Sequence, residues 1–177
     1  LEVFTLFFPE LHSISHFDTV LRQVDAAGPD ANIRMAILLQ DILDPSSILK
    51  RLKYPNDAIK QIKAMVQQKD AVLTDRISLR KFLSSYPADP APYLAYRSAL
   101  NPSFPSDVVQ SLYASVIQDN DCVSLNQLNV RGNDLTVLGY QGKEISDTLQ
   151  ELLQAVMEEK VPNKKENLIA YIKREKN

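Results

Sequence analysis

Apolar residues recur at intervals of three and four along most of the chain, which is the spacing of one buried helix face. Residues 17–27 carry Phe17, Val20, Leu21 and Val24 on one face, and the turn residues that follow predict the end of this helix. Residues 33–42 are almost entirely apolar, so we expect this helix to be the most buried in the N-terminal half. The chain is therefore predicted to be all-α, a multi-helix array of two helical sub-domains.

Turn and capping residues divide the remaining apolar segments into further helices. Ser46 or Ser47 can cap a helix that carries Ile48 and Leu49, and Pro55 is predicted at the first position of the next helix. The same spacing predicts helices at residues 75–86, 93–100 and 106–117. Repeated prolines interrupt helices, and residues 87–105 contain five of them. We therefore expect a helical sub-domain at residues 1–86, proline-rich connecting helices at 87–121, and a second helical sub-domain at 122–177.

Glycine turns organise the C-terminal part of the chain. Gly132-Asn133-Asp134 predicts a turn and an N-cap, because a short polar side chain can accept from the free N–H groups of a helix start. Gly139 and Gly142 are expected to bracket a tight reversal that opens a long amphipathic helix. The apolar face of that helix consists of Ile145, Leu149, Leu152, Leu153 and Val156.

Composition narrows the class of protein. The 177 residues are 45% hydrophobic and 24% charged, which fits a globular chain with its own core. The apolar runs are too short for a membrane span, and a single cysteine, Cys122, suits a reducing cytoplasm. The net charge of −2 hides an acidic segment at residues 1–47 and a basic one at 48–82, and a polyanion would prefer the basic segment.

Two sets of residues resemble one family. The C-terminal set is Gly132, Asp134, Leu135, Gly139, Gly142, Ile145, Leu149, Leu152, Leu153, Val156, Asn163 and Leu168. The N-terminal set lies within residues 25–42 and 52–59 and looks like the HD-type region and the segment after it. Together they resemble the C-terminal region, with neck, body and tail, of bacterial CCA-adding tRNA nucleotidyltransferases. These enzymes belong to the class II superfamily that contains the poly(A) polymerases.

The resemblance implies a division of labour within a longer protein. The catalytic head would lie upstream of Leu1, where the chain begins without an initiator Met, and Mg²⁺ with CTP and ATP would bind only there. The parent would add CMP and AMP to tRNA 3′ ends, whereas this fragment is predicted to be inactive alone. Its expected partner is the acceptor and TΨC arm of tRNA, with no membrane partner and with no cofactor of its own.

Residues that could carry chemistry are few. The resemblance places Gln40 where HD phosphohydrolases have a metal-binding histidine, so we predict no metal site and a structural role for Asp41. His12 and His16 lack a clear third ligand. Asp119-Asn120-Asp121 has a magnesium-binding spacing but lacks the expected context, so we interpret it as a solvated turn. No catalytic residue is assigned, and Cys122 is expected to be buried.

RNA-contact candidates fall at the glycine turns and in the basic segment. A helix start can receive a phosphate, which nominates the turns Arg131-Gly132 and Gly142-Lys143, although such turns also simply join packed helices. The basic segment adds Lys60, Lys63, Arg76, Arg80 and Lys81. Tyr93, Tyr96 and Tyr140 could stack on bases, but a core role is the favoured interpretation for each.

The alternative function is a helical protein–protein interaction module, a homodimer formed through the stripe at residues 145–156. An active HD phosphohydrolase ranks last.

Overall fold

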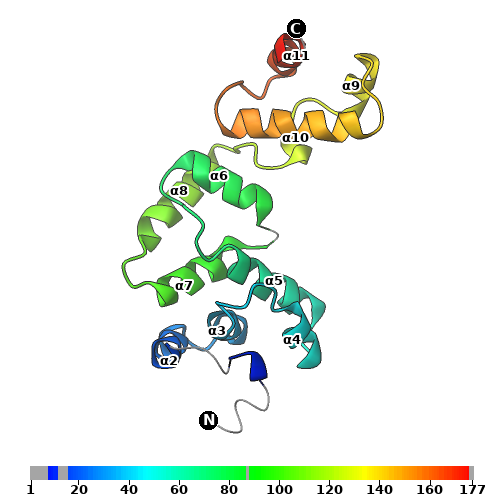
Figure 1. Cartoon of the computed structure of the whole chain (residues 1–177). Helices are drawn as coiled ribbons and strands as arrows, with labels where there is room; N and C mark the ends of the chain where they lie inside the picture. Colours follow the sequence, from blue (N-terminus) through cyan, green and yellow to red (C-terminus); the bar gives the residue numbers. More distant parts are fainter. Residues whose placement is uncertain (1–7, 12–15, 87, 176–177) are drawn as a thin grey trace. The chain divides into compact units, whose positions relative to one another are not determined.

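The computed structural model describes residues 8–11, 16–86 and 88–175, in which helices joined by turns and loops are the regular secondary structure and no strand occurs (Figure 1). The prediction of an all-α protein is confirmed. The N-terminal elements are the 3₁₀ turn η1 (Pro9–Leu11) and the helices α2 (Phe17–Ala26), α3 (Ala31–Leu38), α4 (Ser46–Arg51) and α5 (Asn56–Gln67). Then follow α6 (Arg76–Ser85), α7 (Pro90–Leu100), α8 (Ser106–Gln118), η2 (Leu125–Gln127), α9 (Gly132–Val137), α10 (Lys143–Met157) and α11 (Lys165–Glu175).

The helices form two compact units that alternate along the chain. Unit 1 comprises residues 1–71 and 86–108, and unit 2 comprises residues 72–85 and 109–177. The helix α6 therefore belongs to the same unit as α9, α10 and α11, although α7 separates them in sequence. The predicted three-part division at residues 86/87 and 121/122 stays a prediction.

Unit 1 is built around α3. This helix packs against α2, α5 and α7, and Ile33, Ala36 and Ile37 on it are buried. It ends at Leu38, earlier than the predicted Ile42, because residues 39–45 form a turn that leads into α4. The nearly continuous apolar run therefore predicted correctly that this helix is buried, but the predicted length of the helix was wrong.

Helix starts in unit 1 differ in detail from the sequence prediction. Ser46 does not cap α4 but is its first residue, and the carboxylate of Asp44 accepts hydrogen bonds from the backbone N–H and the hydroxyl of Ser46 at 3.0 and 2.6 Å. Pro55 precedes α5 as its N-cap residue rather than standing inside it. In α7 the cap is Asp89, which accepts from the N–H of Ala91.

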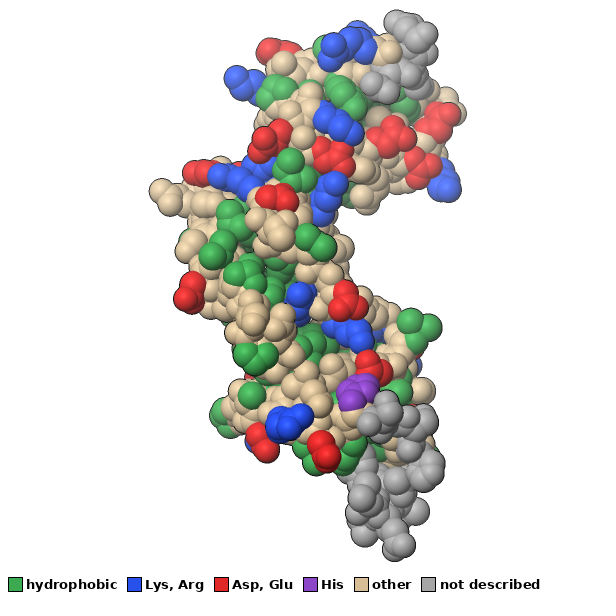
Figure 2. Space-filling view, turned by 60° about the vertical axis from the view of Figure 1, so that its left-hand side comes forward, with side chains coloured by type: hydrophobic (Ala, Val, Ile, Leu, Met, Phe, Trp, Pro, Cys, Tyr) green, Lys and Arg blue, Asp and Glu red, His purple; other side chains and the backbone are tan. Residues whose placement is uncertain are grey.

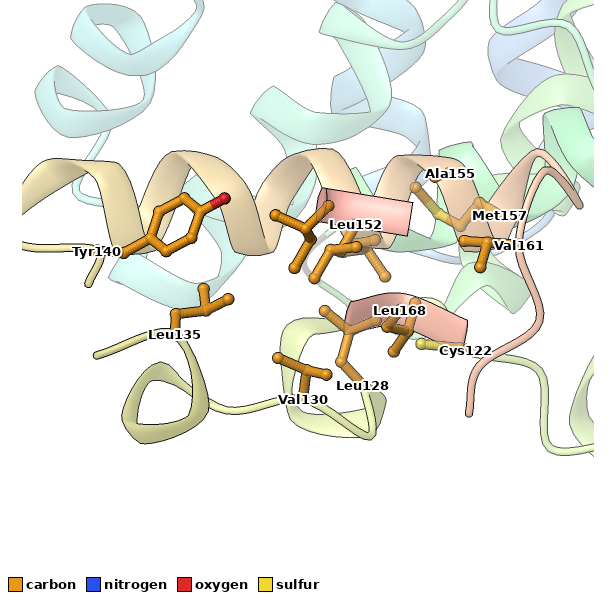
Figure 3. Packing of buried hydrophobic residues seen from close by; sticks show 12 residues of the cluster. Cys122, Leu128, Val130, Leu135, Tyr140, Leu152, Ala155, Met157, Val161 and Leu168 are labelled. Carbon is orange, nitrogen blue, oxygen red and sulfur yellow. The ribbon is translucent and has the colours of Figure 1, made fainter. Parts of the chain in front are cut away.

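Unit 2 has its own hydrophobic core beneath α10. Figure 3 shows Leu152 of α10 facing Leu128 and Val130, with Tyr140 and Leu135 side by side near the start of the helix. Val161 and Leu168 close the other end of the core. The prediction that Leu152 and Leu153 form a buried face is confirmed, since both side chains are almost inaccessible.

The glycine turns serve different physical needs. Gly139 and Gly142 have φ values of +91° and +53°, in the region that only glycine adopts without strain, as a tight reversal requires. Gly132 instead permits close packing, because a Cβ atom there would lie 3.3 Å from Cγ2 of Ile145. Arg131, not the Asn or Asp of the predicted turn, is the N-cap of α9, and Asp134 accepts from its N–H at 2.8 Å.

Candidate nucleic-acid interface

Two of the predicted RNA-contact arginines converge on one carboxylate in unit 2. Arg76 and Arg80 are one helical turn apart on α6 and therefore project from the same face. Arg76 donates from Nε and Nη2 to the two oxygens of Asp121 at 2.8 and 2.7 Å, and Arg80 donates from Nε to Oδ2 at 2.6 Å. The Asp121 side chain is only 9% exposed. The interpretation of this acidic stretch as a solvated turn is wrong for Asp121.

Further acids complete the network. Arg76 also reaches Asp119 at 2.6 Å, and Arg80 reaches Glu159 at 2.8 Å. Arg80 also donates to the carbonyl of Met157 at 3.2 Å, which satisfies a free acceptor at the C-terminal end of α10. Hydrogen bonds from Arg76, followed by those from Arg80, hold the pKa of Asp121 below its usual value. The network thus consists of charged groups that neutralise one another.

Lys81 is engaged in the same way. Its Nζ lies 2.7 Å from Glu158, and Lys160 lies 2.6 Å from the other oxygen of that carboxylate. Lys160 first and Lys81 second lower the pKa of Glu158 to about 2. Arg76, Arg80 and Lys81, which the sequence nominates together, are therefore brought together, but each one faces a carboxylate of its own unit.

The N-terminal candidates are less constrained. Lys63 pairs with Asp44 at 3.2 Å, whereas the nearest acid to Lys60 is Asp57, 3.7 Å away and fully exposed. Such a pair between solvated side chains contributes little. Lys60 remains 74% exposed and is free to take another partner.

The two glycine-turn candidates differ sharply. The guanidinium of Arg131 donates to the carbonyls of Leu125 and Asn126 at 3.0 and 2.8 Å, so it fixes the backbone before α9. Lys143 is 87% exposed, and its only ion-pair contact in the described part of the chain is Asp147 at 4.0 Å. The turn at Gly132 is thus structural in its contacts, and the turn at Gly142 carries a solvent-facing cation.

The HD-like positions hold hydrogen bonds among protein groups. Gln40 donates to Gln23 at 2.9 Å, and Gln23 donates to the carbonyl of Leu100. Asp41 pairs with His16 at 3.0 Å and with Lys69 at 2.9 Å. In the described ranges, no three His, Cys, Asp or Glu side chains are grouped as a metal ion would require. His12 lies outside the described residues.

The remaining candidates belong to the core, as predicted. Tyr93, Tyr96 and Tyr140 are buried, and Tyr93 donates to the carbonyl of Gln68 at 2.7 Å. Cys122 is buried, which raises the pKa of its thiol. None of the three rings is available to stack on a base in this conformation.

Sequence reasoning missed the acids that engage the cations. Asp119 and Asp121 follow α8, and Glu158 and Glu159 follow α10, so the same two helix ends supply them. The spacing of Arg76 and Arg80 was the one available signal, since arginines four residues apart share a face. Asn163, which the resemblance includes, has a structural role: it accepts from the N–H of Asn129 and donates to the carbonyl of Gln127 at 2.9 and 2.8 Å.

The surface bears both charges in alternation. Figure 2 shows acidic and basic side chains intermixed on the visible face, rather than a broad field of one sign. Among the described residues, no helix has both the length and the apolar character needed to cross a membrane.

These features define an all-helical protein whose second unit is fixed by glycine turns and by a network of ion pairs. The family model of tRNA nucleotidyltransferase domain 2 matches residues 33–172, and the chain belongs to this family. It corresponds to a C-terminal region of a tRNA nucleotidyltransferase, as the resemblance indicated. Neither the curated proteins nor the solved structures contain a match to it.

Proposed function

We propose that this chain binds the acceptor and TΨC arm of tRNA as the C-terminal region of a CCA-adding enzyme. The observation that carries the proposal is the family match across residues 33–172. In this proposal the parent transfers CMP and AMP from CTP and ATP with Mg²⁺, and a head outside this chain performs the transfer. The chain contributes the surface that holds the RNA in the cytoplasm.

The predicted RNA-contact cations fall into two groups according to their contacts within the protein. Lys60 and Lys143 are exposed and only weakly engaged, so they are suited to phosphate contact. Arg76, Arg80, Lys81 and Arg131 are held by carboxylates or carbonyls of the protein. A phosphate would have to displace those partners, so these four residues shape the surface rather than supply its free charge.

The dimerisation alternative is less well supported by the same packing. A dimer through the α10 stripe would require its apolar side chains to be accessible. Leu152 and Leu153 are buried, and Leu149 and Val156 pack against the core of unit 2. The stripe is therefore already covered by residues of its own chain.

Direct binding measurements test the proposal. Fluorescence anisotropy with labelled tRNA should show an affinity that falls steeply between 50 and 200 mM salt, as expected when cations displace counterions from phosphates. A minihelix made of the acceptor and TΨC arms should compete as well as whole tRNA, and an anticodon stem-loop should compete poorly.

A single-site pair sharpens this test. Lys143→Gln should weaken tRNA binding about fivefold at 0.1 M salt, which is the loss expected for one phosphate contact. Lys164→Gln, which also removes an exposed charge, just before α11, should have little effect. Absence of tRNA binding even at low salt, or equal competition by both RNA fragments, would reject the proposed function.

A further inference from the structure

The last turn of α4 and the turn that follows it carry cations that have no partner in the described part of the chain. Lys50 and Lys53 are exposed, and neither side chain has a hydrogen bond or an ion pair there. Arg51, which lies between them, is held by Glu10 through two hydrogen bonds of 2.7 and 3.0 Å. Within residues 50–53, Arg51 is therefore paired with a residue of its own chain, whereas Lys50 and Lys53 face solvent.

The backbone at Lys53 is strained. Its φ is +61°, a left-handed conformation that glycine adopts without cost and a lysine does not. The turn is nevertheless well ordered by hydrogen bonds, since the N–H groups of Lys53 and Tyr54 donate to the carbonyls of Lys50 and Leu49 at 3.0 Å each. A charged residue thus occupies a position where glycine would give the more stable backbone.

An aromatic side chain and a further lysine adjoin these two cations. Tyr54 is half-buried, and its hydroxyl has no hydrogen bond within the described residues. Lys60 follows on α5, 74% exposed. Three residues of extended chain and four of helix place the Cα atoms of Lys53 and Lys60 at most roughly 17 Å apart. A polynucleotide presents several phosphates over that distance.

We infer that the α4–α5 turn, together with the adjoining Lys50 of α4 and Lys60 of α5, is a contact surface for the phosphate backbone of RNA, in which Lys50, Lys53 and Lys60 bind phosphates and Tyr54 lies against an unpaired base. This inference rests on the proposed function and adds a site in unit 1 to it. Exposed lysines next to a half-buried tyrosine fit RNA better than an acidic protein, because a base can stack on an aromatic ring and a carboxylate cannot. A phosphate contact also explains why a lysine occupies the strained position.

Matched charge variants test the surface. K50Q/K53Q/K60Q should lose about a hundredfold in tRNA affinity at 0.1 M salt, from about fivefold for each phosphate contact. The dependence of log K on log salt should become shallower by about 2. K164Q/K173Q/R174Q removes the same charge from exposed positions before and on α11 and should stay within about threefold of the wild type on the same basis.

Lys53→Gly separates binding from folding. The variant should unfold at a higher urea concentration, because the backbone strain is removed, and should still bind tRNA about fivefold more weakly. If it is more stable and its tRNA affinity is unchanged, Lys53 only completes the helix end, and the inference fails at this residue.

The outcomes distinguish the two proposals. If wild-type protein does not bind tRNA, the proposed function itself is rejected. If wild-type protein binds but the two triple variants are equally affected, the α4–α5 surface is rejected and the function stands. Poly-glutamate that displaces tRNA from the wild type, but not from K50Q/K53Q/K60Q, would assign the surface to an acidic protein and overturn the inference.

Discussion

Replacing Asp121 with asparagine should destabilise unit 2 more than any other single charge removal in the network. Asparagine keeps the size of the side chain, but the charge that faces Arg76 and Arg80 is lost. The side chains of Asp121 and Arg80 are 9% and 11% exposed, so water can replace little of the lost interaction. Removing one partner of a buried ion pair costs about 3–5 kcal/mol.

For Asp121→Asn, the expected loss in the free energy of unfolding lies below that range, because both arginines keep other partners. Arg76 is 31% exposed and retains Asp119, and Arg80 retains Glu159 and the carbonyl of Met157. We therefore expect Asp121→Asn to lower the free energy of unfolding by about 2–3 kcal/mol. Asp119→Asn is the control, because the Asp119 side chain is 54% exposed and its loss should cost less than about 1 kcal/mol.

Urea unfolding followed by circular dichroism measures both variants. The wild type and the two variants should share one slope with denaturant, so that the midpoints report stability alone. A loss smaller than about 0.5 kcal/mol for Asp121→Asn, or equal losses for the two variants, would refute the reasoning from burial.

Three further predictions concern single groups. Because hydrogen bonds from Arg76 lower the pKa of Asp121 on folding, its contribution to stability should be complete above the unfolded value of about 3.9 and disappear as the pH falls through the folded pKa. The wild-type urea midpoint should therefore fall more steeply on acidification than that of Asp121→Asn, and parallel curves would contradict this. Gly142→Ala should cost about 1–2 kcal/mol in urea unfolding, since φ is +53° while the added Cβ meets nothing within 4 Å; an unchanged midpoint would show that the turn relaxes. The buried hydroxyl of Tyr96 has no hydrogen-bond partner in the described residues, so Tyr96→Phe should leave thermal stability unchanged or raise it by up to about 1 kcal/mol, and a clear loss would reveal a hidden partner.

Local sequence features predicted the elements of this protein well. Helix periodicity repeats every three to four residues, so the apolar pattern alone placed α2, α6, α8 and α10. The turn at Gly139 and Gly142 could also be predicted from the sequence, because the preference of glycine for a positive φ is a property of a single residue. Capping details were less accurate: Asp44 and Arg131 occupy roles that were assigned to neighbouring residues, since several polar side chains near a helix start can compete for the same N–H groups.

Tertiary structure decided which charged residues are paired. The sequence nominated Arg76 and Arg80 for RNA contact, yet their carboxylate partner, Asp121, lies 45 and 41 positions further along the chain. These segments meet only because residues 72–85 and 109–177 fold into one unit. Helix formation depends on neighbours a few residues apart and was readable in advance, whereas charge neutralisation depends on distant groups that meet only in the folded chain.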